Sequence, residues 1–498
     1  MRKIIKAAWI LGHVDGRHRL FKDSTLVIED DRVVEVVATF DGHADETIDA
    51  GNSLVAPGFI DTHVHSGHRA SHRLITDTGR PFYFGQPFLE ISVPKRGKTV
   101  VGDPRYQAHG SQMANAALAL NAEFTVAELL RNGVTTFVEF GSQLAMQEAM
   151  AVQCERLGAR GYLGPGYDCG RWVGGDYGRL ERDFDPAVGE AGLAKALSFA
   201  EEYDGKAGGL INAILVPREV ETSTVELLTK TRDAAQERRL PIATHAAYSV
   251  LEFHDIVREH QMTPIELLDS IGLLGPMLNI GHGNFISDNP NLNYAMKRDL
   301  QLMGEAGVSI SHCPINIVRR GRTLNDFGQY TKAGVNVTIG SDTYPRDMLM
   351  NMRQASYLGK IMSGSYFEAT AGEVFESATV GGARSLGRDD LGRLAPGAKA
   401  DLISIGLDGR GTLRMGPVYD PVRTVVECGV GDDVSMVMVD GKVVVKDGQV
   451  LGADLEKLRA AAQEAGEQVW ETLHDGAPRG RHEDDACPLS YEPVCGCK

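Results

Sequence analysis

Between residues 54 and 342, short apolar runs of strand character alternate with amphipathic helical stretches, and this alternation most constrains the fold. Repeated strand–helix units are typical of a parallel sheet whose crossovers are helices. Eight such units predict an α/β fold, a (β/α)₈ TIM-like barrel. The expected strands are 54–61, 133–140, 160–167, 210–216, 240–246, 277–283, 308–313 and 335–342.

Both ends of the chain have a different pattern, with short β-rich runs separated by turns. TLVIEDDRVVEVVATF predicts a hairpin near the start. DLISIGL, TVVECG (424–429) and VSMVMVDGKVVVKDGQVL predict further strands near the end, with Asp-Gly at 440–441 as a hairpin turn. We therefore expect one small β-sandwich domain built from both chain ends. The predicted division is 1–56 and 390–450 for this β-sandwich, 57–389 for the barrel, and 451–498 for a C-terminal helix and an acidic, cysteine-containing tail.

Composition excludes several classes of partner. The 498 residues include 51 Lys and Arg against 67 Asp and Glu, a net charge of −16, which argues against binding nucleic acid or an anionic membrane. No apolar run approaches the roughly 18 residues of a membrane span. Seven mostly isolated cysteines predict reduced thiols. We expect a cytoplasmic enzyme that acts on a small molecule.

Metal-capable side chains lie at the C-terminal ends of several predicted strands. In FIDTHVH, two histidines two residues apart can face the same ion, because residues i and i+2 of a strand point to the same side. The carboxyl ends of barrel strands form the rim on which barrel enzymes build active sites. The pattern therefore predicts a metal-dependent active site rather than isolated core histidines. The residues are His63, His65, His245, His282, His312 and Asp342.

These motifs resemble the amidohydrolase superfamily, and within it the branch that contains cytosine and guanine deaminases and the chlorohydrolase-like triazine hydrolases. The resemblance covers about residues 1–450. The segments that carry it are GFIDTHVH, PREVETSTVELL, TPIELLDSIGLLGP, HCP, AGVNVTIGSD and GRLAPGAKADLISI.

The resemblance implies that His63, His65, His245 and Asp342 hold one divalent ion, with zinc first and iron, cobalt or manganese as alternatives. Such an ion activates a water molecule for attack. Asp342 would receive the proton of that water, and His282 would hydrogen-bond the attacking oxygen or polarise the group under attack.

Two further positions are implied to contact the substrate. Arg218 resembles a substrate-binding arginine of guanine deaminases, with a salt bridge to a neighbouring loop acid as the alternative interpretation. His312, in the HCP motif, is the second. Glu219 offers a rival two-metal interpretation that we do not favour, because Arg218 occupies the position at which binuclear relatives carry a bridging ligand.

One departure from the branch falls on a catalytic position. Its deaminases carry a glutamate three residues after the histidine of the fifth strand, as a proton shuttle, and this chain has Tyr248 there. A phenol, with a pKa near 10, donates a hydrogen bond but is a poor shuttle at neutral pH. Glu252 could substitute if the helix is shifted; otherwise the leaving group is activated in another way. The HCP segment also departs, reading P-I-N-I instead of P-x-S-N.

Aromatic residues in two long connections predict a lid. The connections are 66–108 and 168–185, and long loops in compact domains are often functional. We expect Phe84 and Trp172 to contact the substrate, with a surface excursion or an oligomer contact as the alternative. The other aromatic residues of the predicted lid are Phe82, Tyr83 and Phe88. The cysteines of the tail, Cys487, Cys495 and Cys497, match no standard zinc spacing.

Taken together, these features predict a metal-dependent hydrolase that cleaves a carbon–nitrogen bond of an amide, urea, amidine or N-heterocycle, and a homodimer as in the family. The alternative is a deaminase or a dechlorinase of a heteroaromatic ring. A more remote alternative is a non-catalytic barrel that serves as a binding module, which need hold no metal ion. The sequence does not identify the substrate, because loops set barrel specificity.

Overall fold

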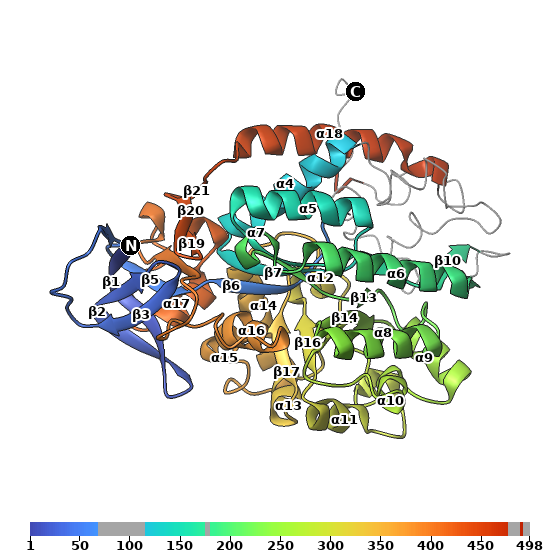
Figure 1. Cartoon of the computed structure of the whole chain (residues 1–498). Helices are drawn as coiled ribbons and strands as arrows, with labels where there is room; N and C mark the ends of the chain where they lie inside the picture. The colour runs from blue at the N-terminus through green and yellow to red at the C-terminus, as the bar shows by residue number, and fades with distance from the viewer. Residues whose placement is uncertain (68–114, 175–179, 477–488, 492–498) are drawn as a thin grey trace.

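The computed structural model describes residues 1–67, 115–174, 180–476 and 489–491, and it has a mixed α/β fold (Figure 1). Parallel strands occupy the middle of the molecule, helices lie around them, and a sheet made from both chain ends lies to one side. In the part of the chain described, no helix combines the length and the apolar character needed to cross a bilayer.

Each of the eight predicted strand segments contains a strand. These strands form two four-stranded parallel sheets in the orders β12-β8-β7-β6 and β14-β15-β16-β17. Isolated parallel bridges, Val64–Asp342 and Leu215–Ile242, connect the two sheets at both edges. The bounds are β6 (Phe59–Val64), β7 (Val134–Glu139), β8 (Arg160–Leu163), β12 (Ile211–Ala213), β14 (Ile242–Ala246), β15 (Leu278–His282), β16 (Ser309–His312) and β17 (Asn336–Ile339), with a short extra pair of β9 (Gly166–Tyr167) and β13 (Val216–Pro217).

Helices separate successive strands, and their starts follow from local sequence. The segment TPIELL begins a helix at Pro264. The Thr263 hydroxyl accepts a hydrogen bond from the backbone N–H of Glu266, and the Glu266 carboxylate accepts one from the backbone N–H of Thr263. The principal helices are α4 (Asn115–Arg131), α5 (Leu144–Leu157), α6 (Pro186–Tyr203), α8 (Val225–Arg238), α9 (Val250–His260), α10 (Pro264–Ser270), α11 (Asp299–Ala306), α12 (Pro314–Val318), α13 (Phe327–Lys332), α14 (Met348–Ser363), α15 (Ala371–Glu376) and α16 (Gly382–Ser385). The predicted C-terminal helix is α18 (Leu455–Gly476), which packs on α4.

Both chain ends contribute to one nine-stranded sheet, as the sequence predicts, with β18 pairing antiparallel with β5. A division of this sheet into two packed layers, the predicted β-sandwich, is not evident from its strand order and stays a prediction. The strands are β1 (Arg2–Val14), β2 (Arg17–Glu29), β3 (Arg32–Val37), β4 (Glu46–Asp49), β5 (Ser53–Pro57), β18 (Leu402–Gly406), β19 (Val434–Val439), β20 (Lys442–Lys446) and β21 (Gln449–Val450).

One local prediction is wrong. TVVECG, expected as a strand, lies in helix α17 (Pro421–Cys428), because Asp420 caps the N-terminus and Pro421 occupies the first turn. The long connection 168–185, predicted as part of a lid, contains an antiparallel pair of β10 (Gly170–Gly174) and β11 (Leu180–Phe184).

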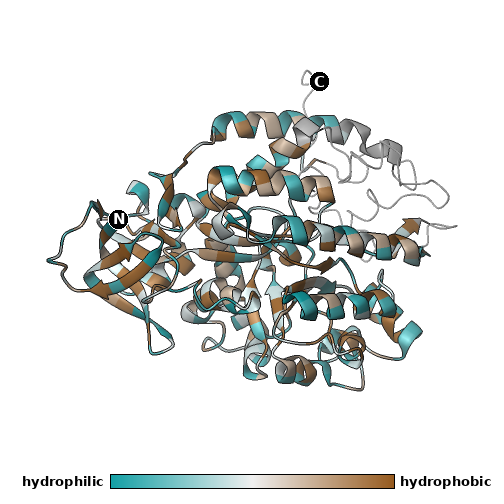
Figure 2. Ribbon diagram, viewed as in Figure 1, coloured by the Kyte–Doolittle hydropathy of each residue, from teal (hydrophilic) through white to brown (hydrophobic). Residues whose placement is uncertain are grey.

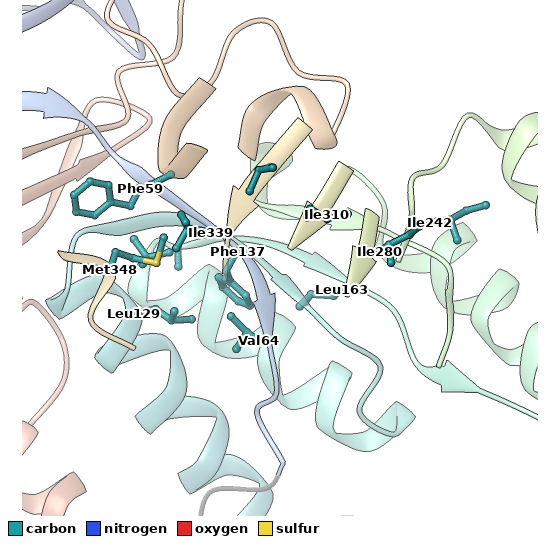
Figure 3. Packing of buried hydrophobic residues seen from close by; sticks show 14 of the residues in the cluster. Phe59, Val64, Leu129, Phe137, Leu163, Ile242, Ile280, Ile310, Ile339 and Met348 are labelled. Carbon is teal, nitrogen blue, oxygen red and sulfur yellow. The ribbon is translucent and has the colours of Figure 1, made fainter. Parts of the chain in front are cut away.

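Buried apolar side chains fill the space between the parallel strands and the helices. Figure 3 shows Phe137, Leu163, Ile310 and Ile339 projecting from these strands into one packed cluster. In Figure 2 the central strands are mostly hydrophobic, whereas the helices around them carry both hydrophobic and hydrophilic residues. This division is expected of a parallel sheet covered by amphipathic helices. The core thereby fixes the strand ends, on which the site is built.

A buried charge network joins the parallel strands to the nine-stranded sheet. Arg160 of β8 is 1% exposed and contacts Asp401 at 3.2 Å and Asp440 at 2.7 Å. Asp401 directly precedes β18, and Asp440 lies in the turn between β19 and β20. Asp401 also accepts a hydrogen bond of 2.8 Å from the backbone N–H of Asp440. A buried guanidinium needs its carboxylate partners, because an unpaired charge in a protein interior is costly.

Replacing Asp401 should therefore destabilise the protein strongly. We expect Asp401→Ala to lower the free energy of unfolding by about 3 kcal/mol, because Arg160 loses a buried counter-charge. The control is Asp432→Ala, which removes the exposed partner of Arg131 and should cost less than about 1 kcal/mol. Urea unfolding followed by circular dichroism measures both, and equal effects of the two changes would contradict the prediction.

Candidate active site

Backbone pairing brings the ends of β6 and β17 together. The N–H of His65 donates to the carbonyl of Asp342 at 2.8 Å, and the N–H of Asp342 donates to the carbonyl of His63 at 2.7 Å. These two bonds join segments that are nearly three hundred residues apart in the chain. The imidazoles of the HVH motif and the carboxylate of Asp342 consequently face one point.

The predicted metal ligands converge with the spacing of a coordination sphere. The Nε2 atoms of His63 and His65 lie 3.1 Å apart, those of His65 and His245 lie 3.3 Å apart, and Nε2 of His65 lies 3.7 Å from Oδ1 of Asp342. A tetrahedral zinc ion with Zn–N bonds of about 2.0–2.1 Å separates its nitrogen ligands by about 3.3 Å. The donor set and its spacing fit one divalent ion.

The surroundings of the imidazoles keep them neutral and oriented. Burial, the largest cause, lowers the pKa of His63 well below its usual value and also lowers that of His245. Nδ1 of His245 lies 2.8 Å from the carbonyl oxygen of Arg218 and donates to it, which leaves the Nε2 lone pair free for an ion. The ring of Phe140 stacks on His63 with centroids 3.8 Å apart. Neutral imidazole is the form that binds metals.

Asp342 is held by two further side chains. The Asn316 amide donates to Oδ2 of Asp342, and Nε2 of His282 lies 3.8 Å from the same oxygen. Burial raises the pKa of Asp342, against the lowering effect of the Arg320 charge. Asp342 and His282 both have positive φ angles, +62° and +76°, which are uncommon for non-glycine residues and are found at functional sites.

Two glycines leave room for the imidazoles. A Cβ atom on Gly281 would lie 2.7 Å from Cε1 of His63 and 3.1 Å from Cδ2 of His245. A Cβ atom on Gly340 would lie 2.6 Å from Cβ of His63. The rings occupy the space that any larger residue would fill, so these glycines are part of the site.

Tyr248 lies beside the metal-ligand cluster and is bonded to a carboxylate. Its ring centroid is 6.0 Å from that of His245 and 6.4 Å from that of His282. Its hydroxyl donates to Oε1 of Glu221, and Nε1 of Trp172 donates to the same oxygen at 3.4 Å. Glu221 is 1% exposed, and burial, the largest cause, raises its pKa well above the usual value.

Glu252, which the sequence left open as a substitute proton shuttle, caps a helix instead. Its carboxylate accepts hydrogen bonds from the backbone N–H groups of Ala247 and Tyr248, both at 2.7 Å, and closes the capping box of α9 with Ser249. Burial raises the pKa of Glu252 to about 8. Glu252 thus holds the backbone that presents Tyr248, and its oxygens are occupied there.

The remaining predicted residues fall into different places. Arg218 lies 3.5 Å from Asp168, the salt bridge considered as its alternative role, and its side chain is 42% exposed. Asp61, beside the HVH motif, accepts backbone hydrogen bonds from His63 and Ser341 and so supports the end of β6. His312 is buried at the end of β16, and burial lowers its pKa to about 4.

Several predictions concern residues that the structure does not describe. Phe82, Tyr83, Phe84 and Phe88, and the tail cysteines Cys487, Cys495 and Cys497, lie outside the described residues. Trp172 is described, and it contacts Glu221 and the guanidinium of Arg182, 5.6 Å from its ring.

Sequence reasoning missed Glu221, Asn316 and Phe140. Glu221 lies in the PREVETSTVELL segment that carries part of the family resemblance, so its place near a strand end was a usable signal. Asn316 lies in the departing P-I-N-I segment and nevertheless reaches Asp342. Phe140 ends a predicted strand without a polar group, and nothing in the sequence distinguishes it from core.

Comparisons with known proteins agree with this geometry. Residues 54–444 match the family model described as "Amidohydrolase family". A 5-methylthioadenosine/S-adenosylhomocysteine deaminase of Natronomonas pharaonis is 27% identical over 442 residues, covering 88% of this chain and 92% of the relative. A protein of the same description from Halobacterium salinarum is 29% identical over 447 residues, covering 89% and 93%. The family predicted from the motifs is confirmed.

Solved structures share the fold at lower identity. An adenosine deaminase from Xanthomonas campestris with bound zinc superimposes with a TM-score of 0.77 at 19% identity, covering 94% of this chain and 98% of the other. An atrazine chlorohydrolase from Arthrobacter aurescens, complexed with zinc, gives a TM-score of 0.75 at 21% identity, covering 93% and 100%. The mixed α/β fold is thus that of amidohydrolases.

Loss of one imidazole should remove the metal. We expect His245→Ala to bind less than a tenth of the wild-type metal and to lose activity, because a tetrahedral site with two of three nitrogens left is weak. The control is His254→Ala on the exposed face of α9. Metal analysis of the purified proteins by mass spectrometry measures this, and a fully loaded, active His245→Ala protein would rule out the ligand assignment.

Filling the space between the imidazoles should also weaken metal binding, although every ligand side chain is kept. We expect Gly281→Ala to weaken metal binding at least about tenfold, the scale seen when the support of a ligand is disturbed. The added methyl group would displace His63 and His245. Gly275→Ala, where a Cβ atom meets nothing within 4 Å, is the matched control. Titration with a competing chelator measures both affinities; unchanged binding in Gly281→Ala would show that the rings lie elsewhere.

Proposed function

The chain belongs to the amidohydrolase family, and from this premise we propose that it hydrolyses a carbon–nitrogen bond of a small molecule at the cluster of His63, His65, His245 and Asp342. The predicted enzyme class, a metal-dependent amidohydrolase acting on carbon–nitrogen bonds other than peptide bonds, is confirmed by the family match and its relatives. The observation that carries the site assignment is the convergence of three Nε2 atoms and one carboxylate oxygen.

The ion in this proposal is a single zinc. Three imidazoles and one carboxylate suit zinc, and iron, cobalt or manganese can occupy the same donor set. Two solved structures of this fold hold zinc, which supports the choice. Among the described residues, Glu219 is not in any group of side chains close enough to bind a metal, and its carboxylate accepts from Thr222 at 3.2 Å. One metal is therefore favoured over two.

When bound, the ion supplies a Lewis acid that activates water and polarises the group under attack. Asp342 takes the proton of the attacking water, and Asn316 keeps its carboxylate in place. His282, neutral through burial, donates a hydrogen bond to the oxygen that develops negative charge. Arg218 and His312 orient the substrate, and Trp172 contacts it.

We also propose an architecture and an assembly for this chain. The eight parallel strands close into a (β/α)₈ barrel over about residues 57–389, which the bridges Val64–Asp342 and Leu215–Ile242 support. Residues 1–56 and 390–450 form the small β domain, and 451–498 the C-terminal extension. We further propose a homodimer in the cytoplasm, which the free thiols of Cys154, Cys169, Cys313 and Cys428 suit.

Two leaving groups are supported by different observations. The similarity to a 5-methylthioadenosine/S-adenosylhomocysteine deaminase and a 5'-deoxyadenosine deaminase favours release of ammonia from a purine-type ring. Tyr248, in place of the glutamate that the deaminases of the resembled branch carry, favours an amide or urea, whose amine leaves from a carbonyl carbon. We place the amide or urea first and ring deamination or dechlorination second. A barrel that only binds its ligand would turn over neither.

A paired screen on zinc-loaded protein tests this function. The probes are 4-nitroacetanilide and phenylurea for the first class, and S-adenosylhomocysteine and atrazine for the second. Release of 4-nitroaniline, aniline, ammonia or chloride identifies the bond that breaks. We expect turnover of at least one probe. This turnover should require metal and should be absent in His245→Ala. Stoichiometric metal without turnover of any probe, or turnover in the presence of excess chelator, would contradict the proposed function.

A further inference from the structure

The position at which the deaminases of this branch carry a glutamate is occupied by a hydrogen-bonded pair of side chains from two neighbouring strand ends. Tyr248 follows β14 and Glu221 follows β13, and these segments lie side by side through the bridges Leu215–Ile242 and Glu219–His245. Because the two strand ends are adjacent, a carboxylate after one strand reaches a side chain after the next. The carboxylate missing after His245 is thus present in space, one strand away.

We propose that Glu221 and Tyr248 form a proton relay in which Tyr248 meets the substrate and Glu221 holds the proton. This inference rests on the proposed hydrolysis and concerns how the departing nitrogen is protonated. Glu221 acts through Tyr248 and is a positioning residue; Tyr248 is the group that contacts the reacting atoms.

The contacts around Glu221 support this role. Its Oε1 atom accepts from both Tyr248 and Trp172, while its Oε2 atom is buried without a hydrogen-bond partner among the described residues. A carboxylate that served only to anchor a tyrosine would be expected to satisfy both oxygens, because a buried unpaired oxygen costs free energy. One oxygen of Glu221 is left available to hold a proton.

The backbone on both sides of the pair is fixed. The guanidinium of Arg182 donates to the carbonyl oxygen of Glu221, and the Glu252 carboxylate holds the N–H of Tyr248 at 2.7 Å. Ala247, before the tyrosine, has a φ of +51°, which turns the chain between His245 and Tyr248. The tyrosine is half-buried, whereas Glu221 is 1% exposed. Tyr248 is therefore the member of the pair that a substrate can reach.

The relay balances over one turnover. As the water oxygen bonds to carbon, its O–H bond breaks and Asp342 takes the proton. Asp342 then passes a proton to the Tyr248 oxygen while the Tyr248 hydroxyl proton passes to Glu221. When the C–N bond breaks, its electron pair stays on nitrogen and a proton from Tyr248 forms the N–H bond. The Glu221 proton then restores the hydroxyl. Asp342, Tyr248 and Glu221 all end as they began.

A relay that protonates the leaving group makes a prediction that a structural contact does not. Its loss should slow substrates whose nitrogen needs a proton to depart and should hardly affect those whose leaving group departs without one. We therefore compare probe pairs that differ only in the leaving group. These are 4-methoxyacetanilide with 4-nitroacetanilide, and adenosine with 6-chloropurine riboside.

The variants are Tyr248→Phe, Glu221→Gln and their double mutant, each loaded with zinc. We expect each variant to lower kcat about 100-fold or more on the member of a pair whose leaving group needs a proton, which is in the lower range for a lost acid–base group. On the other member we expect kcat to fall less than about tenfold. KM should change little. The double mutant should be no slower than the slower single variant, because both changes interrupt one path.

Two controls separate the relay from damage to the site. Metal content, and the visible spectrum of cobalt-loaded protein, should match the wild type in every variant. Tyr248→Glu returns a carboxylate directly to the third position after His245, and in that background Glu221→Gln should cost less than about threefold. Thr222, next to Glu221, provides the matched neighbouring change Thr222→Val, which should not alter the leaving-group ratio.

The outcomes are distinct. A loss of kcat only on the substrate whose leaving nitrogen needs a proton, with unchanged metal content, supports the relay. Equal losses on both members of a pair, or wild-type rates in Glu221→Gln, overturn it while leaving the hydrolase assignment standing. Absence of wild-type turnover on both members of both pairs counts against the proposed function itself, and the relay falls with it.

Discussion

The site depends on the backbone pairing between His65 and Asp342. The N–H of His65 donates to the carbonyl of Asp342 and the N–H of Asp342 donates to the carbonyl of His63, and these two bonds fix how far the first parallel strand extends past the last one. Side chains alternate along a strand, so a shift of one residue in this pairing would turn the imidazoles of His63 and His65 away from the carboxylate. The geometry of the proposed metal site is thus set by main-chain register, which the packed core beneath it maintains.

Bringing these groups together has a cost that an ion relieves. Three imidazoles with nitrogens 3.1 and 3.3 Å apart cannot all be satisfied by hydrogen bonds among themselves, because neutral imidazole has one donor and one acceptor. His282 and Asp342 add positive φ angles to this cost. Arrangements of this kind persist where binding compensates them, and the buried Arg160 network illustrates how firmly the surrounding fold is tied.

The parallel strands could be predicted from sequence because each is a short apolar run between helical segments, and their ends carry residues with few structural uses. His245, His282 and Asp342 were found for that reason. TVVECG could not be told from a strand by its apolar residues alone. The buried residues Val422, Val425 and Val426 of α17 follow a helical spacing, and the N-cap at Asp420 favours the helix over a strand.

Glu221 and Asn316 escaped prediction for a different reason. Each acts on a partner from another strand, Tyr248 and Asp342, so the relation exists only in the fold. A sequence motif specifies the residue type at one position, whereas the reaction requires only that a suitable side chain reach the reacting atoms. A carboxylate that approaches from the next strand through a phenol meets the same requirement as one at position 248, provided that the phenol never has to hold the charge. A concerted transfer through the Tyr248 hydroxyl satisfies that condition, because one proton arrives as another leaves.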